Sequence, residues 1–268
     1  MKRMILALAT VLMTLAVTAQ TRVVAHRGYW QTDGSAQNSL TSLRLASEAG
    51  CWGTEFDVWI TADGVCVVNH DATIDGIRIE DAKYADICDK KLKNGETLPS
   101  LEQYLWEAVH YPNLRLVLEI KAHSTAEGDQ RCTDEVLRLV KKCLVVEQTD
   151  YISFSMRVCE RLIEKGMTVL SGPNGLRSGA VDNPVMHVAY LSGDVAPADI
   201  KAKGLTGIDY EQSVLLDKHP EWIQEAHDLG LTVNIWTVDD LNRVWDCIGK
   251  KIDFVTTNRP VESVKLAK

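Results

Sequence analysis

Two carboxylates stand out in the first quarter of the 268-residue chain because their spacing suits metal chemistry. Glu55 and Asp57 are two residues apart in the apolar stretch GTEFDVWI, so in a β-strand both side chains point to the same face. Two buried anionic carboxylates repel each other and destabilise the fold unless a cation lies between them. The pair therefore predicts a site for a divalent metal ion. The alternative is a strand edge that faces solvent.

A third carboxylate and a lysine follow the same pattern in the stretch VLEIKAH. Glu119 and Lys121 share one face of the predicted strand, so Glu119 can add a third oxygen ligand to the same ion. Mg²⁺ and Ca²⁺ prefer such a shell of oxygen ligands. Lys121 would supply positive charge for an anionic substrate. The alternative for this pair is a Glu–Lys salt bridge at the rim of the sheet.

Histidines lie at the ends of two further apolar runs. His26 and Arg27 directly follow the apolar residues of VAHRG, and His70 follows shortly after those of VVNHD. Histidine titrates near neutral pH, so two histidines beside a metal-bound phosphate suit general acid–base catalysis, and an arginine suits phosphate binding. A lone histidine is more often a core or surface residue, and it is the combination with three carboxylates that favours catalysis. We expect His123 to be a loop residue.

These polar residues need a fold that brings several strand ends together. Apolar runs alternate with amphipathic helical patterns, and eight runs qualify as strands: residues 22–26, 53–60, 114–121, 151–155, 187–191, 207–210, 232–238 and 253–258. The order helix, glycine, strand recurs, with Gly50 as the predicted cap after the first helix, and it is typical of a parallel sheet. Eight such units in about 250 residues indicate a closed (β/α)8 TIM barrel, with reactive groups at the carboxyl ends of the strands. An open, doubly wound sheet is the alternative.

Two segments depart from this alternation. After the second strand, a tight turn at residues 62–64 introduces a short extra strand, and residues 74–98 are predicted to form a surface excursion with one helix. Residues 167–184 are rich in glycine and proline and are interpreted as a loop inserted between the fourth and fifth units. Residues 168–170 are the alternative to 187–191 as the fifth strand.

The first 19 residues have the composition of a secretory signal peptide. Lys2 and Arg3 precede an apolar run over residues 4–17, and small residues give a cleavage site near Ala19. The run is short for a membrane span, which takes about 20 apolar residues. We therefore expect an exported protein, periplasmic or secreted, without a stable membrane anchor, in which residues 20–268 form one barrel domain. A buried or membrane helix is the alternative.

Charge and cysteine content exclude two classes of site. The formal net charge is −8, and a chain this acidic lacks the basic face that non-specific nucleic-acid binding needs. The seven cysteines are odd in number and show no CxxC spacing, which argues against a disulfide framework or a zinc site. We expect mostly free, buried thiols. The sequence does not indicate an oligomeric state.

The motifs VAHRG, EFDV, VVNHD, LEIK and NIWTVDD…IDFVTTNRP, in this order, resemble those of the glycerophosphodiester phosphodiesterases. The resemblance runs over residues 22–262. It implies a (β/α)8 barrel that uses one divalent cation, Mg²⁺ or Ca²⁺, to hydrolyse small-molecule glycerophosphodiesters to glycerol 3-phosphate and an alcohol. It also implies roles for individual residues: metal ligands Glu55, Asp57 and Glu119, the acid–base pair His26 and His70, phosphate-binding Arg27 and Lys121, and an aromatic side chain at the substrate's mouth, Trp236.

One position departs from the family pattern. After HRG the family usually has PENT, whereas this chain has AQNS, so Asn38 is retained and Gln37 replaces a glutamate near the metal or the alcohol. This change affects the expected metal or alcohol more than the expected chemistry. Two rival functions stay open. A lysophospholipase-D-like activity is disfavoured by the polar stretch SGPNGLRSGAVDNP at residues 171–184, and a binding protein for a phosphorylated ligand would not need both His26 and His70.

Overall fold

Eight parallel strands form a closed barrel in the computed structural model, which describes residues 20–170 and 187–268. The barrel closes because β1 (Arg22–Ala25) pairs with β11 (Phe254–Thr257) on one side and with β2 (Gly53–Ile60) on the other. The other five strands follow in chain order: β6 (Arg115–Ile120), β7 (Thr149–Ser153), β8 (Val188–Tyr190), β9 (Gly207–Glu211) and β10 (Thr232–Trp236). The predicted (β/α)8 TIM barrel is confirmed, and the open sheet is wrong.

Each of the eight predicted runs overlaps a barrel strand, although β7 begins two residues before the predicted run 151–155. The fifth strand is β8, as predicted at 187–191, and the alternative at residues 168–170 is wrong because these residues end the helix α4 (Met156–Leu170). Residues 167–170 are therefore helical rather than loop. The rest of the predicted loop and the predicted signal peptide at residues 1–19 lie outside the described residues.

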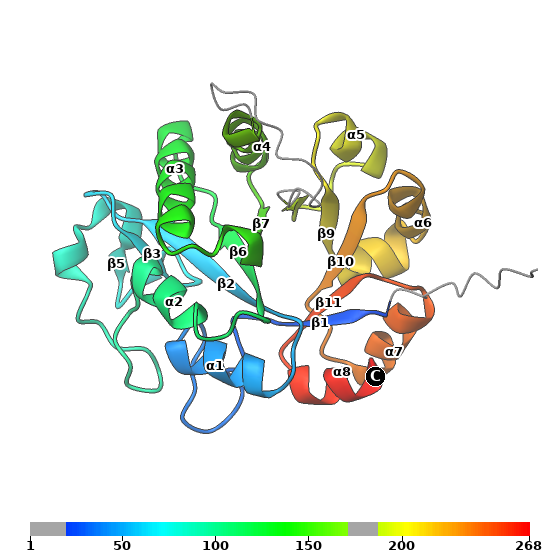
Figure 1. The fold of residues 1–268 in the computed structure, drawn as a ribbon, viewed down its shortest axis with the longest axis horizontal. Helices are drawn as coiled ribbons and strands as arrows, with labels where there is room; N and C mark the ends of the chain where they lie inside the picture. Colours follow the sequence, from blue (N-terminus) through cyan, green and yellow to red (C-terminus); the bar gives the residue numbers. More distant parts are fainter. Residues whose placement is uncertain (1–19, 171–186) are drawn as a thin grey trace, which may run out of the picture.

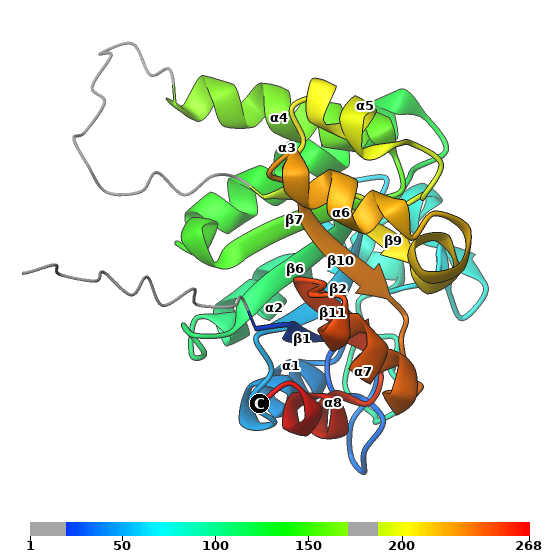
Figure 2. The same ribbon diagram turned by 90° about the vertical axis from the view of Figure 1, so that its right-hand side faces the viewer.

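Helices surround the strands in chain order, as Figure 1 shows. They are α1 (Leu40–Glu48), α2 (Leu101–Ala108), α3 (Ala126–Lys142), α4, α5 (Pro197–Ala202), α6 (Glu221–Asp228), α7 (Leu241–Gly249) and α8 (Pro260–Leu266). Figure 2 shows α6 in front of β9 and β10, with α7 below it. The helices pack an apolar stripe on the barrel, and α3 buries Cys132, Val136 and Leu139 in this way. Gly50 follows α1 with φ +75°, as its predicted capping role requires.

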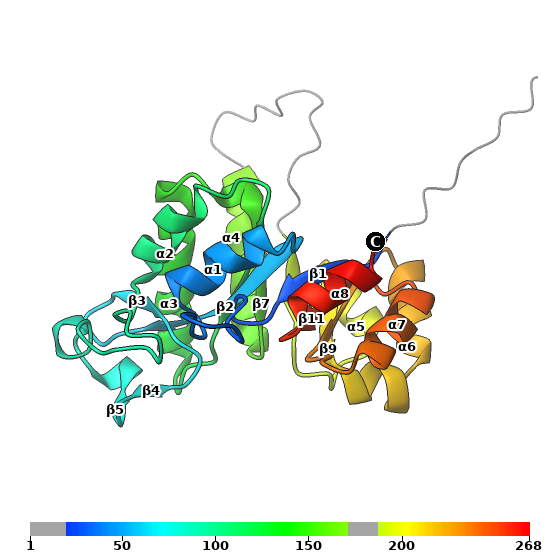
Figure 3. The ribbon, with the colours of Figure 1, turned by 90° about the horizontal axis from the view of Figure 1, so that it is seen from below.

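The excursion after β2 is built from short elements. β3 (Cys66–Val68) runs antiparallel to β2, which confirms the extra strand, and β4 (Thr73–Ile74) pairs with β5 (Ile77–Arg78). The predicted single helix in residues 74–98 is wrong. Two 3-10 turns, Ile79–Asp81 and Tyr84–Asp86, take its place, because the segment packs on a small apolar cluster of its own instead of presenting a helical stripe. Figure 3 shows this excursion at the lower left, beyond β2 and β3.

All seven cysteines are free, and six of them are buried, as expected.

The barrel interior holds its own apolar cluster, made by Val24, Val117, Ile152 and Leu191. None of the helices in the described residues combines the length and the apolar character needed to cross a bilayer.

Candidate active site

A cavity of about 270 Å³ lies at the carboxyl ends of the barrel strands. Every residue that the sequence singled out for chemistry lines it: His26, Arg27, Glu55, Asp57, His70, Glu119, Lys121 and Trp236. They converge because strand pairing brings them to one end of the barrel. His26 and Arg27 directly follow β1, whose last residue Ala25 pairs with Thr54 beside Glu55, and Asp57 pairs with Glu119 near the end of β6. His70 joins them from the segment after the antiparallel β3.

The three acidic side chains of the cavity come close enough to share one ion. Carboxylate oxygens of Glu55, Asp57 and Glu119 lie within 4.8 Å of one another, and all three residues are buried. The strand edge that faces solvent is therefore wrong. Burial, followed by repulsion from the other two carboxylates, raises the pKa of Glu55 well above its usual value. Burial and Asp57 raise the pKa of Glu119 to about 7.

This carboxylate cluster fits a divalent cation. Glu55 Oε1 is buried and has no hydrogen-bond partner among the described residues. A cation between the three groups would satisfy this oxygen and offset the repulsion that raises the two pKa values. The donor set consists of oxygens alone, as Mg²⁺ and Ca²⁺ prefer.

Asp57 is the carboxylate that protein groups hold in its charged form. Lys121 Nζ donates to its Oδ1 (3.0 Å) and Asn38 Nδ2 donates to its Oδ2 (2.8 Å). Burial alone would raise the pKa of Asp57, but Lys121 and these neighbours lower it to about 2. Lys121 Nζ also lies 2.8 Å from Glu119 Oε1, so the alternative Glu–Lys salt bridge exists, but inside the cavity.

Arg27 is fixed at both its backbone and its guanidinium group. Its backbone N–H donates to Glu55 Oε2 (2.8 Å), its Nη1 donates to Gln37 Oε1 (2.8 Å), and its φ is +56°. Its Nε lies 3.8 Å from Asp57 Oδ2. Gln37 therefore contacts the arginine, and its amide oxygen orients the guanidinium toward the carboxylate cluster.

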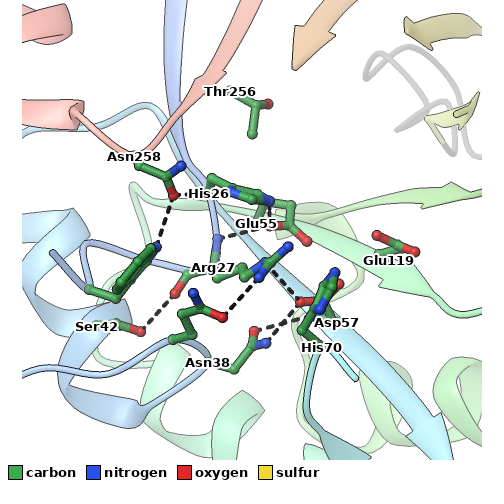
Figure 4. Close-up of polar contacts among 12 residues, drawn as sticks. His26, Arg27, Asn38, Ser42, Glu55, Asp57, His70, Glu119, Thr256 and Asn258 are labelled. Carbon is green, nitrogen blue, oxygen red and sulfur yellow. Dashed lines mark hydrogen bonds and ion pairs between the residues drawn. The ribbon is translucent and has the colours of Figure 1, made fainter. Parts of the chain in front are cut away.

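The tautomer of His26 follows from its hydrogen-bond chain (Figure 4). His26 Nδ1 lies 3.0 Å from Asn258 Oδ1, which also accepts from Trp30 Nε1 (2.9 Å). Asn258 Nδ2 donates to Asp239 Oδ2 (2.9 Å), which fixes the orientation of the amide. Because the amide oxygen can only accept, His26 Nδ1 carries the proton and Nε2 keeps its lone pair.

The free nitrogen of His26 faces the carboxylate cluster. Its Nε2 lies 4.0 Å from Glu55 Oε2. Burial, followed by the charge of Arg27, lowers the pKa of His26 to about 4, so the ring is neutral near pH 7. A neutral imidazole with an unprotonated nitrogen aimed into a cavity can accept a proton there.

His70 enters the cavity from the other side, on the segment after β3. Its side chain is 37 % exposed, and its Nδ1 lies 2.7 Å from Asp71 Oδ1. Figure 4 shows it beside Asp57. His123, expected in a loop, is indeed in the loop after β6, but it is buried. Its Nε2 accepts from the Ile60 backbone N–H (3.3 Å), so its contacts are structural.

The sequence singled out Trp236 but not three other residues that line the cavity, Phe154, Asp209 and Thr256. Phe154 and Trp236 meet edge to face with their ring centroids 5.5 Å apart. Asp209 sits in the run GIDY, and Asn258 directly follows FVTT. Both are polar residues in or after an apolar strand, the same signal that identified Glu55 and His26.

Comparisons with known proteins agree with this geometry. The model of the glycerophosphoryl diester phosphodiesterase family matches residues 26–262. A crystal structure of a glycerophosphodiester phosphodiesterase from Parabacteroides distasonis ATCC 8503 is 42% identical, with a TM-score of 0.85, and the match covers 93% of this chain and 98% of that chain. A phosphodiesterase of Oleispira antarctica, solved with the product sn-glycerol-3-phosphate, is 19% identical with a TM-score of 0.68, and it shares the fold over 92% of this chain and 96% of that chain.

Among curated proteins, glycerophosphodiester phosphodiesterase 1 of Homo sapiens is 26% identical over 161 residues, which are 54% of this chain and 48% of that protein. The chain thus spans about half the length of the curated relatives it matches.

Proposed function

Because the chain belongs to the glycerophosphoryl diester phosphodiesterase family, we propose that it hydrolyses glycerophosphodiesters to glycerol 3-phosphate and an alcohol. One observation carries the proposal. A single cavity gathers three carboxylates that fit a divalent cation, two cationic side chains and two histidines. This set can bind a phosphodiester and transfer protons on both sides of its phosphorus atom.

Glu55, Asp57 and Glu119 would hold Mg²⁺ or Ca²⁺. When bound, such an ion neutralises negative charge on a phosphoryl oxygen. Arg27 and Lys121 line the same cavity and would bind the other phosphate oxygens. Asp57 already orients Lys121, and Gln37 and Asp57 orient Arg27. The two cationic side chains therefore need little rearrangement as charge develops in the transition state.

His26 is the proposed base. Its Nε2 would take the proton from the 2-hydroxyl of the substrate's glycerol, and the oxygen would then attack phosphorus to form a cyclic phosphate. His70 would protonate the oxygen of the departing alcohol. In the second step the two histidines exchange roles, and water opens the ring. The neutral Nδ1–H tautomer of His26 supports its part, and the exposure of His70 suits a group that faces the exit.

A turnover assay on residues 20–268 tests the function. The substrates are glycerophosphocholine, glycerophosphoethanolamine and lysophosphatidylcholine, each with the metal-free protein and with added Mg²⁺ or Ca²⁺. We expect release of glycerol 3-phosphate from the two glycerophosphodiesters, only with metal. Turnover of lysophosphatidylcholine but of neither glycerophosphodiester would assign a lysophospholipase-D-like activity. Binding of a substrate without turnover of any of the three would identify a binding protein.

An analogue without the glycerol 2-hydroxyl tests the internal attack. The proposed route predicts that it is not cleaved. Cleavage at the normal rate would show that water attacks phosphorus directly.

We also propose that the protein is exported and cleaved near Ala19. The basic, apolar and small-residue order of residues 1–19 supports this. Expression of the full chain in a bacterium, followed by fractionation and N-terminal sequencing, should give an exported product that starts near Gln20. An intact N-terminus in the cytoplasmic fraction would contradict it.

A further inference from the structure

Asp209 is a buried acidic residue of the cavity that the proposed chemistry does not use. It is 1 % exposed, and it lines the cavity at β9. Its Oδ1 is buried and has no hydrogen-bond partner in the part of the chain that the structure describes. Because leaving a buried polar atom without a partner is costly, such an atom in a cavity wall points to a ligand.

The carboxyl group is held in one orientation. Asn234 Nδ2 donates to Asp209 Oδ2 (3.0 Å), and Thr256 Oγ1 donates to Asn234 Oδ1 (3.2 Å). Trp236 Nε1 donates to the backbone oxygen of Asp209 (2.9 Å), which fixes the strand at this point. With Oδ2 engaged, Oδ1 is the atom available to a molecule in the cavity.

Strand register places this group deep in the barrel. Asp209 pairs with Asn234, and Glu211 pairs with Trp236, two residues closer to the rim. Two residues along a strand are about 6.6 Å, so Asp209 lies one layer below the aromatic side chain. The apolar side chains of Ile152 and Leu191 also line the cavity. The deep part of the cavity therefore combines the carboxyl group of Asp209 with the aliphatic side chains of Ile152 and Leu191.

The chemistry of this floor fits a hydroxyl group better than a cation. Burial, despite the hydrogen bond from Asn234 and together with the nearby charge of Glu119, raises the pKa of Asp209 to about 8. Near neutral pH the group is thus mainly a carboxylic acid, which can both donate to a hydroxyl and accept from one. The aromatic pair Phe154 and Trp236, which could face a larger or cationic group, lies nearer the rim.

We propose that Asp209, positioned by Asn234, binds the terminal hydroxyl of the substrate's glycerol at the floor of the cavity. The assignment of this subsite rests on the proposed function, and it adds the orientation of the substrate in the cavity. The glycerol enters first, the phosphate stops at the carboxylate cluster, and the departing alcohol points past Phe154 and Trp236 to the mouth. Asp209 is then the residue that requires a glycerol in the substrate while the alcohol varies.

A comparison of two substrates tests this subsite. Glycerophosphocholine carries the terminal hydroxyl, and 2-hydroxypropyl phosphocholine lacks it but keeps the 2-hydroxyl that attacks phosphorus. For the wild type we expect kcat/KM to fall about 10-fold on the second substrate, the effect of one lost hydrogen bond at a buried site. In Asp209→Ala, kcat/KM should fall by a similar factor on glycerophosphocholine. On 2-hydroxypropyl phosphocholine, kcat/KM of the variant should stay close to that of the wild type.

Two variants serve as controls. Asp209→Asn keeps the side-chain volume and can still bond Asn234, so it should be intermediate and folded even if the alanine variant is not. Asp228→Asn, which changes an exposed aspartate of α6, should leave both substrates unaffected. Equal losses on both substrates in the Asp209 variants would overturn the proposal. So would a loss that depends on whether the alcohol is choline or ethanolamine, because the floor would then bind the alcohol.

A binding measurement separates this subsite from the proposed reaction. Calorimetry with Mg²⁺ should show that sn-glycerol 3-phosphate binds the wild type about 10-fold more tightly than 2-hydroxypropyl phosphate, and that Asp209→Ala removes the difference. If no diester is turned over but this preference is observed, the function fails and the subsite stands. If diesters are cleaved but the two phosphates bind equally, the subsite fails and the function stands.

Discussion

Glu55 shows how burial and like charge act together on one residue. Its carboxylate is buried beside two others, and burial and these neighbours raise its pKa. Glu55→Gln should weaken Mg²⁺ binding by at least about 10-fold, the loss that follows removal of even an outer partner of a metal ligand. Turnover should fall with it. The metal-free variant should be more stable than the wild type, because one source of repulsion is gone.

Titration calorimetry with Mg²⁺ and thermal unfolding with and without chelator measure these effects. Glu48→Gln, at an exposed glutamate of α1, is the matched control and should change neither the Mg²⁺ affinity nor the stability of the metal-free protein. Unchanged metal affinity in Glu55→Gln would remove this residue from the ligand set.

Asn258 fixes the tautomer of His26 and is not among the residues that line the cavity. Asn258→Leu removes the acceptor of the Nδ1 proton, so the ring can rotate or carry its proton on Nε2. We expect kcat to fall toward the loss expected on removal of the base, about 10²–10⁴-fold, with KM and metal affinity little changed. Trp30→Phe removes only the second donor to the same oxygen and should keep most of the activity. Normal kcat in Asn258→Leu would show that this hydrogen bond does not orient the base.

Asp209 should make the stability of the metal-free protein depend on pH. The pKa of Asp209 is about 8 in the folded state against an ordinary value of 3.8, so the folded state binds more protons between these limits. Its contribution to the free energy of unfolding therefore falls as pH rises through this range. Asp209→Asn removes this dependence. Urea unfolding at about pH 5 and about pH 7.5 should show a larger stability gain for the variant at the higher pH. An equal difference at both values would contradict the raised pKa.

At the scale of elements, the segment after β1 depends on its contact with α1. Gly28 has φ +76°, and a Cβ there would lie 2.7 Å from the backbone carbon of Ser42 in α1. Gly34 also has φ +76°, but a Cβ there would have no atom within 4 Å. Gly34→Ala should therefore cost only the conformational penalty, about 1 kcal/mol, whereas Gly28→Ala should add overpacking of about 1–3 kcal/mol.

Chemical denaturation of both glycine variants gives these two costs separately. Gly28→Ala should also lower turnover, because a shift of the segment moves His26 and Arg27. Equal destabilisation by the two substitutions would mean that α1 yields to the added methyl group.

The elements that the sequence predicted are those with a periodic pattern of their own. Barrel strands such as β2 are continuous apolar runs, and α4 has a clear amphipathic stripe, so both can be read locally. The excursion between β3 and α2 was harder, because its short strands and 3-10 turns are stabilised by packing on a separate cluster. The capping box of Ser100 and Gln103 marks the start of α2, which the apolar pattern alone did not reveal.

The same distinction explains which site residues could be found. Glu55, Asp57 and Glu119 were visible because each interrupts an apolar run with charge. Asn258 and Asp209 carry the same kind of signal, but their roles depend on partners in other strands. His26 and Asn258 are 232 residues apart in the chain, and only the register of β1 on β11 brings them together.

At the scale of the whole molecule, the first and last strands close the barrel. Deletion of residues 254–268 removes β11 and α8, and leaves edges of β1 and β10 unpaired. We expect the shortened chain to lose cooperative unfolding and to associate through these edges. Circular dichroism melting and light scattering measure both effects, and a chain without Lys268 alone is the control. Cooperative melting of a monomeric shortened chain would show that closure is dispensable.

The His26–Asn258 hydrogen bond also has a consequence for when the active site is completed during protein synthesis. A growing chain contains the three clustered carboxylates and both cavity histidines once Glu119 has been added. The residue that assigns the proton on His26 is added more than a hundred residues later, with the last strand. A nascent or prematurely ended chain would thus hold most of the reactive groups without an oriented base. Phosphodiester cleavage would begin only after Asn258 has been added and β11 has paired with β1.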